Sequence, residues 1–550
     1  MNISALAAVI HAASNAGLEY RWATLDLGAG NALGDKSKVA RDSAVSTVLS
    51  RAPLGLAAPL VRVEVHLGNG LPGFVIVGLP EAVVRESKER VRAALITAGF
   101  TFPVARITVN LSPADLPKEG GRFDLPIAIG ILTASAQLPR HALHRREFYG
   151  ELSLSGELRE TPKLLPALVA GARFGNELIV PAANALEAGL VAVPQIRLAD
   201  HLLAICNALR DGTPLPIAAR SAPPEAAPSP DLADIRGQFA AKRGLEIAAA
   251  GEHGVLLMGP PGAGKTLLAQ RLPGLLPPLC NTEALEVASL ESAAGRRPAA
   301  DGRRPFRNPH HTASMAALIG GAGFRPGELS LAHLGVLFLD ELPEFARNAL
   351  EALREPLESG TVVLARVKRS CEFPARFQLI AAMNPCPCGY AGDPRGRCRC
   401  TAAQVARYRS RVSGPLIDRI DIHLEVAALP PEQLVAMNSV PSENSATVAR
   451  RVDAARRIQM DRQGKPNGRL LANETMRLCR LDQACRTLVG AAITRLGLSA
   501  RAYQRILKLA RTCADLAGEP EIAVAHVAEA VRLRAFDRFA CGGETLSSTA

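Results

Sequence analysis

The chain has few aromatic residues and no apolar stretch long enough to cross a lipid bilayer. Phe, Trp and Tyr make up 4% of its 550 residues, so stacking on nucleic-acid bases is expected to contribute little to binding. A membrane-spanning helix needs about 20 consecutive apolar residues, and no such run occurs. The first residues also lack the basic segment and cleavage site of a secretory signal. We therefore expect a cytoplasmic protein without a membrane partner.

Acidic residues are outnumbered by basic ones, 52 against 64, which gives a net charge of +12. This excess favours a polyanionic partner, although a solvated basic surface produces the same count. A hydrophobic content of 48% is typical of globular proteins, and the length allows about three or four domains. Because no secretion signal is present, the eleven cysteines point to reduced thiols or a bound metal.

A complete phosphate-binding motif lies at residues 259–266, between an expected strand at His253–Met258 and a helix expected to start at Leu267. Backbone N–H groups of such a loop bind phosphate oxygens. Lys265 can reach the β- and γ-phosphates, and the Thr266 hydroxyl can coordinate Mg²⁺. The sequence therefore predicts a site for ATP and Mg²⁺. The predicted nucleotide-binding residues are Gly259, Pro260, Pro261, Gly262, Ala263, Gly264, Lys265 and Thr266.

Polar side chains follow two further apolar segments. Asp340 and Glu341 come directly after Val336–Leu339, and Asn384 follows Gln378–Met383. In parallel α/β sheets, ligands bind at the carboxyl ends of the strands. Asp340 is expected to hold Mg²⁺, Glu341 to activate a water molecule and Asn384 to position that water. These residues predict that the site hydrolyses ATP as well as binding it.

Two cysteine pairs flank a turn-rich loop at Gly389–Arg397. They are Cys386 with Cys388, and Cys398 with Cys400. Four thiolates can form a tetrahedral Zn²⁺ site. Zinc sites usually have C-x₂₋₄-C spacing, however, so free thiols or a disulfide formed on oxidation remain alternatives.

The segment Gly360–Phe377 is expected to form a β-hairpin with three basic residues near its turn, Arg366, Lys368 and Arg369. These side chains would bind DNA phosphates without reading the base sequence, which makes binding salt-dependent. A solvated loop is the alternative. His310 and His311 are expected to pack or to face DNA rather than to bind a metal.

Changes in composition and periodicity divide the chain into six segments. In order they are a poorly ordered extension, an α/β domain, a Pro/Ala-rich linker, an ATPase core, a helical domain and a tail. The expected bounds are 1–45, 46–210, 211–233, 234–428, 429–536 and 537–550. A misplaced start codon is the alternative explanation of the first segment. The expected fold class is multidomain α/β, with a parallel sheet flanked by helices in the ATPase core.

Several blocks resemble the ComM/YifB family of magnesium-chelatase-like AAA+ ATPases, from about Arg51 to Phe536. They are GLPEAVVRESKERVRAAL, PADLPKEGGRFDLPIAI, FRNPHH, VLFLDELPEF and AAMNPCPCGY. The resemblance implies an AAA+ core with a C-terminal helical lid, and a homo-hexameric ring with ATP between subunits. It also implies a DNA motor that drives branch migration of single-stranded and branched DNA in natural transformation, with no small-molecule substrate beyond ATP.

The N-terminal domain resembles the Lon-protease fold. Pro117–Asp124 takes the place of the loop that carries the nucleophilic serine in active relatives, and it contains no serine. Lys163 lies near the place of the general-base lysine, but a dyad needs a hydroxyl partner. The resemblance therefore implies a scaffold rather than a protease.

Two arginines resemble residues that act on the γ-phosphate in this family. Arg419, in GPLIDRID, resembles an arginine finger, and Arg501, in LSARAY, resembles a lid-helix sensor, with Arg505 as its competitor. A guanidinium group suits both roles because it spreads positive charge over phosphate oxygens. Two other functions remain open: a magnesium-chelatase-type motor that remodels a protein partner, and a non-translocating, ATP-gated scaffold or regulator.

Overall fold

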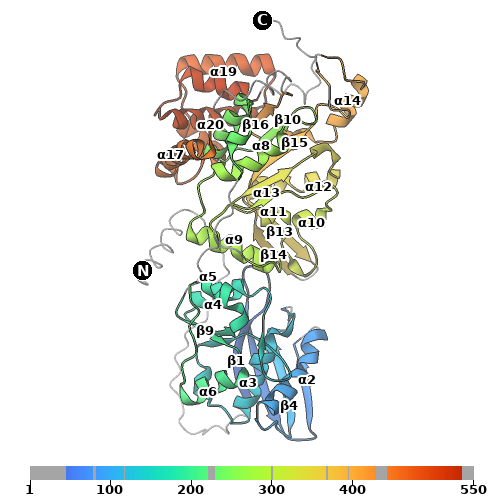
Figure 1. Cartoon of the computed structure of the whole chain (residues 1–550), viewed down its shortest axis with the longest axis vertical. Coiled ribbons are helices and arrows are strands. Elements are labelled where there is room, and N and C mark those ends of the chain that lie inside the picture. The colour runs from blue at the N-terminus through green and yellow to red at the C-terminus, as the bar shows by residue number, and fades with distance from the viewer. Residues whose placement is uncertain are drawn as a thin grey trace.

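The computed structural model describes residues 45–78, 82–116, 118–191, 193–220, 230–298, 301–366, 369–393, 395–428 and 443–534. It confirms the multidomain α/β fold: an N-terminal α/β domain, a central domain with a parallel sheet, and a C-terminal group of helices follow one another along the molecule (Figure 1). Apart from Val45, the expected extension at 1–45 and tail at 537–550 lie outside the described residues. None of the described helices is long and apolar enough to cross a membrane.

The N-terminal domain is built on a seven-stranded sheet with the order β3-β4-β2-β1-β5-β8-β9. Its strands are β1 (Val45–Arg51), β2 (Leu60–Gly68), β3 (Gly73–Val77), β4 (Arg106–Ser112), β5 (Arg146–Phe148), β8 (Glu177–Pro181) and β9 (Ile196–Ala199). Its helices are α2 (Ala82–Thr97), α3 (Asp124–Ala134), α4 (Leu165–Arg173), α5 (Ala185–Val191) and α6 (Leu202–Asp211), and β6 (Glu151–Leu152) pairs with β7 (Leu158–Arg159). Alternating apolar residues in β2 bury Val61, Val63 and Val65 in the core.

Strand β1 lies at the centre of this sheet, directly after the segment at 1–45 for which the sequence predicted a poorly ordered extension. Two of its buried positions are occupied by Ser46 and Ser50, which hides the apolar alternation that marks β2. The Ser46 hydroxyl donates to the Gly130 carbonyl at 2.6 Å, so helix α3 satisfies a buried polar group that the sequence pattern alone could not place.

The central domain contains a five-stranded sheet with the order β11-β12-β15-β10-β16, all of whose pairs are parallel. Its strands are β10 (Val255–Met258), β11 (Phe306–Arg307), β12 (Val336–Leu339), β15 (Gln378–Met383) and β16 (Ile422–Glu425). Every residue of β10, β12 and β15 is buried, because helices cover both faces of such a sheet.

Short helices and one hairpin surround this sheet. The helices are α7 (Phe239–Gly251), α8 (Lys265–Arg271), α9 (Asn281–Ala293), α10 (Met315–Ile319), α11 (Glu328–Leu331), α12 (Arg347–Glu351), α13 (Arg354–Ser359), α14 (Ala402–Arg409) and α15 (Gly414–Ile417). The hairpin consists of β13 (Thr361–Arg366) and β14 (Arg369–Pro374), inside the segment where the sequence predicted one.

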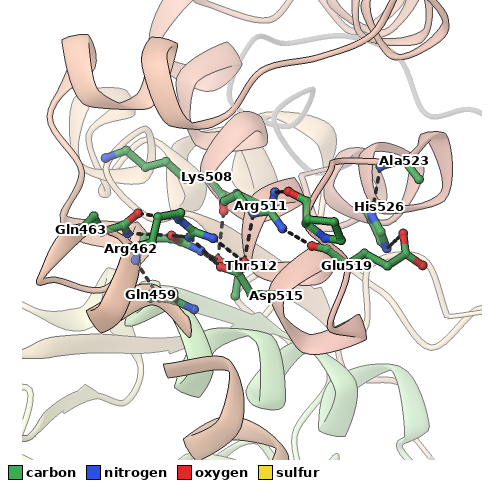
Figure 2. Close-up of polar contacts among 12 residues, drawn as sticks. Gln459, Arg462, Gln463, Lys508, Arg511, Thr512, Asp515, Glu519, Ala523 and His526 are labelled. Carbon is green, nitrogen blue, oxygen red and sulfur yellow. Dashed lines mark hydrogen bonds and ion pairs between the residues drawn. The ribbon is translucent and has the colours of Figure 1, made fainter. Parts of the chain in front are cut away.

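The C-terminal helices are α17 (Ser445–Gln463), α18 (Ala472–Leu478), α19 (Gln483–Leu496), α20 (Ala500–Ala517) and α21 (Val524–Arg532). Helices α17 and α20 pack on α7 of the central domain. A buried carboxylate, Asp515, joins them: it accepts hydrogen bonds from Arg462 at 2.7 and 2.9 Å and from Arg511 at 3.0 Å (Figure 2). The Arg462–Asp515 contacts fix α20 relative to α17.

Candidate active site

The phosphate loop connects the carboxyl end of β10 to the first turn of α8. Its last glycine, Gly264, has a φ of 91°, a conformation that favours glycine. At the other end of the loop, a Cβ atom on Gly259 would lie 2.1 Å from the Val426 carbonyl oxygen. The loop can therefore pass this close to the chain after β16 only because residue 259 has no side chain.

Four of the predicted site residues meet at this edge of the sheet. Lys265 Nζ donates to Asn384 Oδ1 at 3.0 Å and to the Gly259 carbonyl at 2.7 Å, and Thr266 Oγ1 donates to Asp340 Oδ2 at 2.8 Å. Burial lowers the pKa of the Lys265 ammonium group, while the carboxylate charges of Asp340 and Glu341 oppose that shift. The register of β10 with β15, and of β15 with β12, brings these segments together.

Glu341 follows in a left-handed backbone conformation, with a φ of 54°, and its carboxylate side chain is 54% exposed. Its Oε2 atom lies 3.4 Å from Nδ1 of His311. Sequence analysis expected His311 to pack or to face DNA and did not connect it with Glu341. This contact depends on β11 and β12 being neighbours in the sheet. A single sequence does not reveal that strand order.

Among the described residues, the two predicted phosphate-sensing arginines make no polar contact with these side chains. Arg419 donates to the Pro415 carbonyl at 2.7 Å and pairs with Glu358, and its side chain is 9% exposed. It borders an open cleft of about 600 Å³ that is also lined by Glu351, Arg354, Glu355, Glu358 and Ser359. Among the described residues, no hydrogen bond or ion pair joins Arg419 to the phosphate loop of its own chain.

Arg501 lies exposed in the first turn of α20, and within the described parts of the chain it has no hydrogen-bond or ion-pair partner. Its competitor, Arg505, is bound to Asp421, which also contacts His253 Nδ1 at 3.0 Å. Burial tends to raise the pKa of Asp421, but the Arg505 guanidinium and the His253 hydrogen bond hold it well below its usual range. Arg505 is therefore already engaged, whereas Arg501 is available to a ligand.

The four cysteines of the two pairs, the cysteine cluster, gather with all their Sγ atoms within 4.8 Å of one another. Cys386 Sγ lies 3.3 Å from Cys388 Sγ and 3.7 Å from Cys398 Sγ. Zn–S bonds of about 2.3 Å in a tetrahedron place the sulfur atoms about 3.8 Å apart, whereas a disulfide needs about 2.0 Å. The donor set and its spacing fit Zn²⁺.

The loop between the two cysteine pairs packs against the phosphate loop. Cys386 follows Asn384 by two residues, and a Cβ atom on Gly389 would lie 2.5 Å from Cδ of Pro261. Gly389 has a φ of 85°, so both its conformation and its neighbour require glycine. Changes in the cysteine loop can therefore reach the nucleotide site through direct packing.

The hairpin carries its basic residues where the sequence predicted them, and Lys368 lies outside the described residues. Arg366 and Arg369 are direct cross-strand partners. The base of the hairpin packs against the N-terminal domain, because Phe373 and Cys371 share a hydrophobic cluster with Leu56. The Arg366 guanidinium lies over the Phe324 ring, 6.0 Å from its centroid, and Phe324 packs against the same cluster.

In the N-terminal domain, an ion pair joins the two segments in which the sequence resemblance located the positions of a protease dyad. Lys163 Nζ lies 3.3 Å from a carboxylate oxygen of Glu119. A carboxylate cannot serve as the hydroxyl nucleophile that a lysine base would activate. The scaffold role of the domain stays a prediction.

Three models of the magnesium-chelatase family match the chain: subunit ChlI at residues 231–434, a further ChlI model at 63–184, and the ChlI C-terminal region at 442–534. The competence protein ComM of Haemophilus influenzae is 50% identical over 503 residues, which cover 90% of this chain and 98% of that protein. The uncharacterized protein YifB of Escherichia coli is 48% identical over 501 residues, with the same coverage of 90% and 98%. The magnesium-chelatase 38 kDa subunit of Acidiphilium rubrum is 30% identical over 156 residues, 24% of this chain and 45% of that subunit.

Proposed function

The chain belongs to the ComM/YifB family of magnesium-chelatase-like AAA+ ATPases, and from that premise we propose that it is an ATP-driven, ring-forming DNA motor. The family implies an ATPase that uses ATP and Mg²⁺. The observation that carries the ATPase step is the meeting of Lys265, Thr266, Asp340 and Asn384 at one sheet edge. The DNA step is supported by the basic hairpin and by the competence protein among the relatives.

In the proposed reaction, Lys265 exchanges its loop carbonyls for the β- and γ-phosphates of ATP. Thr266 and Asp340, which now share a hydrogen bond, hold Mg²⁺. Mg²⁺ held there would neutralise charge that develops on the phosphate oxygens. Glu341 accepts a proton from the attacking water, and Asn384 orients that water.

The ring is supported by the position of Arg419. Arg419 borders the open cleft, and among the described residues it has no polar contact with its own phosphate loop. We assign it to the nucleotide of the neighbouring subunit, where the γ-phosphate replaces Glu358 as its anionic partner. Arg501 then contacts ATP from the lid, so each site takes one arginine from each of two subunits.

DNA binding is assigned to the tip of the hairpin. Like charges placed directly opposite each other destabilise an antiparallel pair, by up to about 1 kcal/mol. An anion beside the Arg366–Arg369 pair would offset this repulsion, and DNA phosphates are such anions. Together with the competence protein among the relatives, this favours single-stranded and branched DNA as substrates in natural transformation.

We assign Zn²⁺ to Cys386, Cys388, Cys398 and Cys400 as a structural ion. The sulfur spacing matches a tetrahedral site, and the protein side of that site is complete with four thiolates. The cysteine loop begins two residues after Asn384 and packs on Pro261. A zinc ion in this loop would therefore stabilise the positions of Asn384 and of the phosphate loop.

The proposed function is tested by ATP turnover with and without single-stranded DNA and a synthetic four-way junction. A DNA motor is expected to show DNA-stimulated turnover and to move the junction when assembled with ATP. ATPase activity that ignores both DNAs would overturn the motor and favour remodelling of a protein partner. The absence of turnover under all conditions would favour a non-translocating scaffold.

A further inference from the structure

Residues 385–411, the basic segment, contain the cysteine cluster and helix α14 and carry a large share of the positive charge of the chain. The segment holds six arginines and one acidic residue, Asp393, whereas the whole chain has a net charge of +12. Four thiolates around Zn²⁺ would add a charge of about −2, so the segment stays positive with the metal bound. Such a concentration of charge is typical of a surface that binds a polyanion.

The arginines of the basic segment fall into two groups. Three are engaged within the protein by a carboxylate or a backbone carbonyl, and they are Arg397, Arg409 and Arg411. The other three are exposed, and within the described parts of the chain their side chains make no hydrogen bond or ion pair; they are Arg395, Arg399 and Arg407. Three guanidinium groups are therefore available to a ligand.

The backbone that carries these guanidinium groups is held in place. The Arg399 N–H group donates a hydrogen bond to the Cys388 sulfur. Helix α14 begins with a capping box, in which the Thr401 N–H group donates to Gln404 Oε1 at 2.9 Å. Tyr408 anchors the other end of this helix in the core of the central domain. Because the backbone is ordered before binding, a ligand has less entropy to offset.

The basic segment and the β13–β14 hairpin lie at different ends of the central domain. The hairpin is next to the N-terminal domain and packs against Leu56 of that domain, whereas α14 is at the end farther from it (Figure 1). A DNA segment bound at the hairpin therefore leaves the basic segment free to bind another.

We propose that Arg395, Arg399 and Arg407 form a second DNA-binding surface, which contacts the phosphate backbone of a DNA segment other than the one held by the hairpin. The inference rests on the proposed DNA motor. Guanidinium groups bind phosphate oxygens without regard to base sequence. A branched DNA has several arms, and two basic surfaces at different ends of the central domain can each hold one.

An acidic surface of a neighbouring subunit is the other polyanion that the basic segment could meet. The open cleft beside Arg419 is the acidic candidate, since it is lined by three glutamates. Two of these glutamates, however, are already paired within the same chain, Glu351 with Arg354 and Glu358 with Arg419. Most of the negative charge of the cleft is therefore neutralised, which favours DNA as the partner.

The test compares two variants that each lose three positive charges. In the triple variant, Arg395, Arg399 and Arg407 are replaced by Ala. Its matched control changes three exposed arginines of the N-terminal domain to Ala, namely Arg62, Arg159 and Arg210. Each phosphate contact contributes about 0.7 to the slope of log affinity for single-stranded DNA against log salt. The triple variant should therefore lower this slope by about 2, while the control should match wild type.

Two further variants separate phosphate binding from packing. A phosphate contact needs a positive charge, so Arg395→Lys, Arg399→Lys and Arg407→Lys together should keep the slope of wild type. Adding the triple Ala change to Arg366→Ala and Arg369→Ala of the hairpin should lower the slope by about 3.5 on single-stranded DNA long enough to reach both surfaces. The losses add because the two surfaces bind different DNA segments.

Several results would overturn the second surface. One is a triple Ala variant whose slope equals that of the control while wild-type protein binds DNA and moves a four-way junction. Loss of slope in the Lys variant as well would show that the arginines have a structural role. Loss of the ring in sedimentation with an unchanged slope would show that they contact a neighbouring subunit. If wild-type protein binds no DNA at any salt concentration, the DNA motor itself fails, and with it the premise of this inference.

Discussion

Replacing Cys386 and Cys388 together by Ser removes two of the four sulfur atoms of the cysteine cluster and is expected to abolish zinc binding. Structural zinc sites of this kind contribute about 10–16 kcal/mol at pH 7. The loop between the pairs has little else to order it, because no described side chain from 387 to 400 belongs to a hydrophobic cluster. Its other contacts include Gly389 against Pro261 and the exposed Arg397 side chain on the Tyr390 ring at 4.3 Å. Loss of the metal should therefore unfold the loop while leaving the parallel sheet intact.

Three measurements follow this change. Elemental analysis should find about one zinc per wild-type chain and none in the double variant. X-ray absorption at the zinc edge should show four sulfur neighbours at about 2.3 Å. Limited trypsin digestion should cut the variant at Arg395 or Arg397, which lie in the loop. Because Gly389 packs on Pro261, ATP turnover should also fall, by about tenfold or more.

Cys280→Ser is the matched control, since Cys280 is exposed and lies outside the cysteine cluster. It should retain zinc, resistance to trypsin and turnover. The reasoning fails if protein purified under reducing conditions contains no zinc and its loop nevertheless resists trypsin. In that case contacts within the protein alone would order the loop.

The other changes address the nucleotide site, the ring and the hairpin. Lys265→Ala should abolish ATP binding in an equilibrium binding assay, whereas Glu341→Gln should bind ATP and fail to hydrolyse it in a single-turnover assay. Rapid hydrolysis by Glu341→Gln would contradict the water-activating role of Glu341. Arg419→Ala should bind ATP normally but lose most ATP turnover. Mixing Arg419→Ala subunits with Lys265→Ala subunits should restore some ATPase activity. If mixing restores none, Arg419 does not act on the nucleotide of the neighbouring subunit. Arg366→Ala with Arg369→Ala should keep basal ATPase activity, while the slope of log affinity for single-stranded DNA against log salt falls by about 1.4. An unchanged slope would remove these two residues from the DNA interface.

Local motifs explain why much of the site could be predicted from the sequence. The phosphate loop is one contiguous segment, so its glycines, Lys265 and Thr266 reveal their chemistry without any tertiary contact. Buried parallel strands are apolar throughout, and this marked the positions where Asp340 and Asn384 leave the sheet. The two close cysteine pairs were visible for the same reason, although only the fold shows that all four sulfur atoms converge.

Tertiary structure decided the features that depend on which segments become neighbours. The order of β11 and β12 pairs His311 with Glu341, and the docking of α20 engages Arg505 with Asp421 while leaving Arg501 exposed. The sequence pattern did not indicate strand β1, because a serine, Ser46, occupies one of its buried positions. The hydroxyl of Ser46 donates a hydrogen bond to the carbonyl of Gly130 in α3, a residue distant in the chain. The sequence alone thus determined the local chemistry of each motif, since that chemistry belongs to adjacent residues. Strand order and helix docking determined which of those motifs act on one another, because such contacts join residues that are distant in the chain.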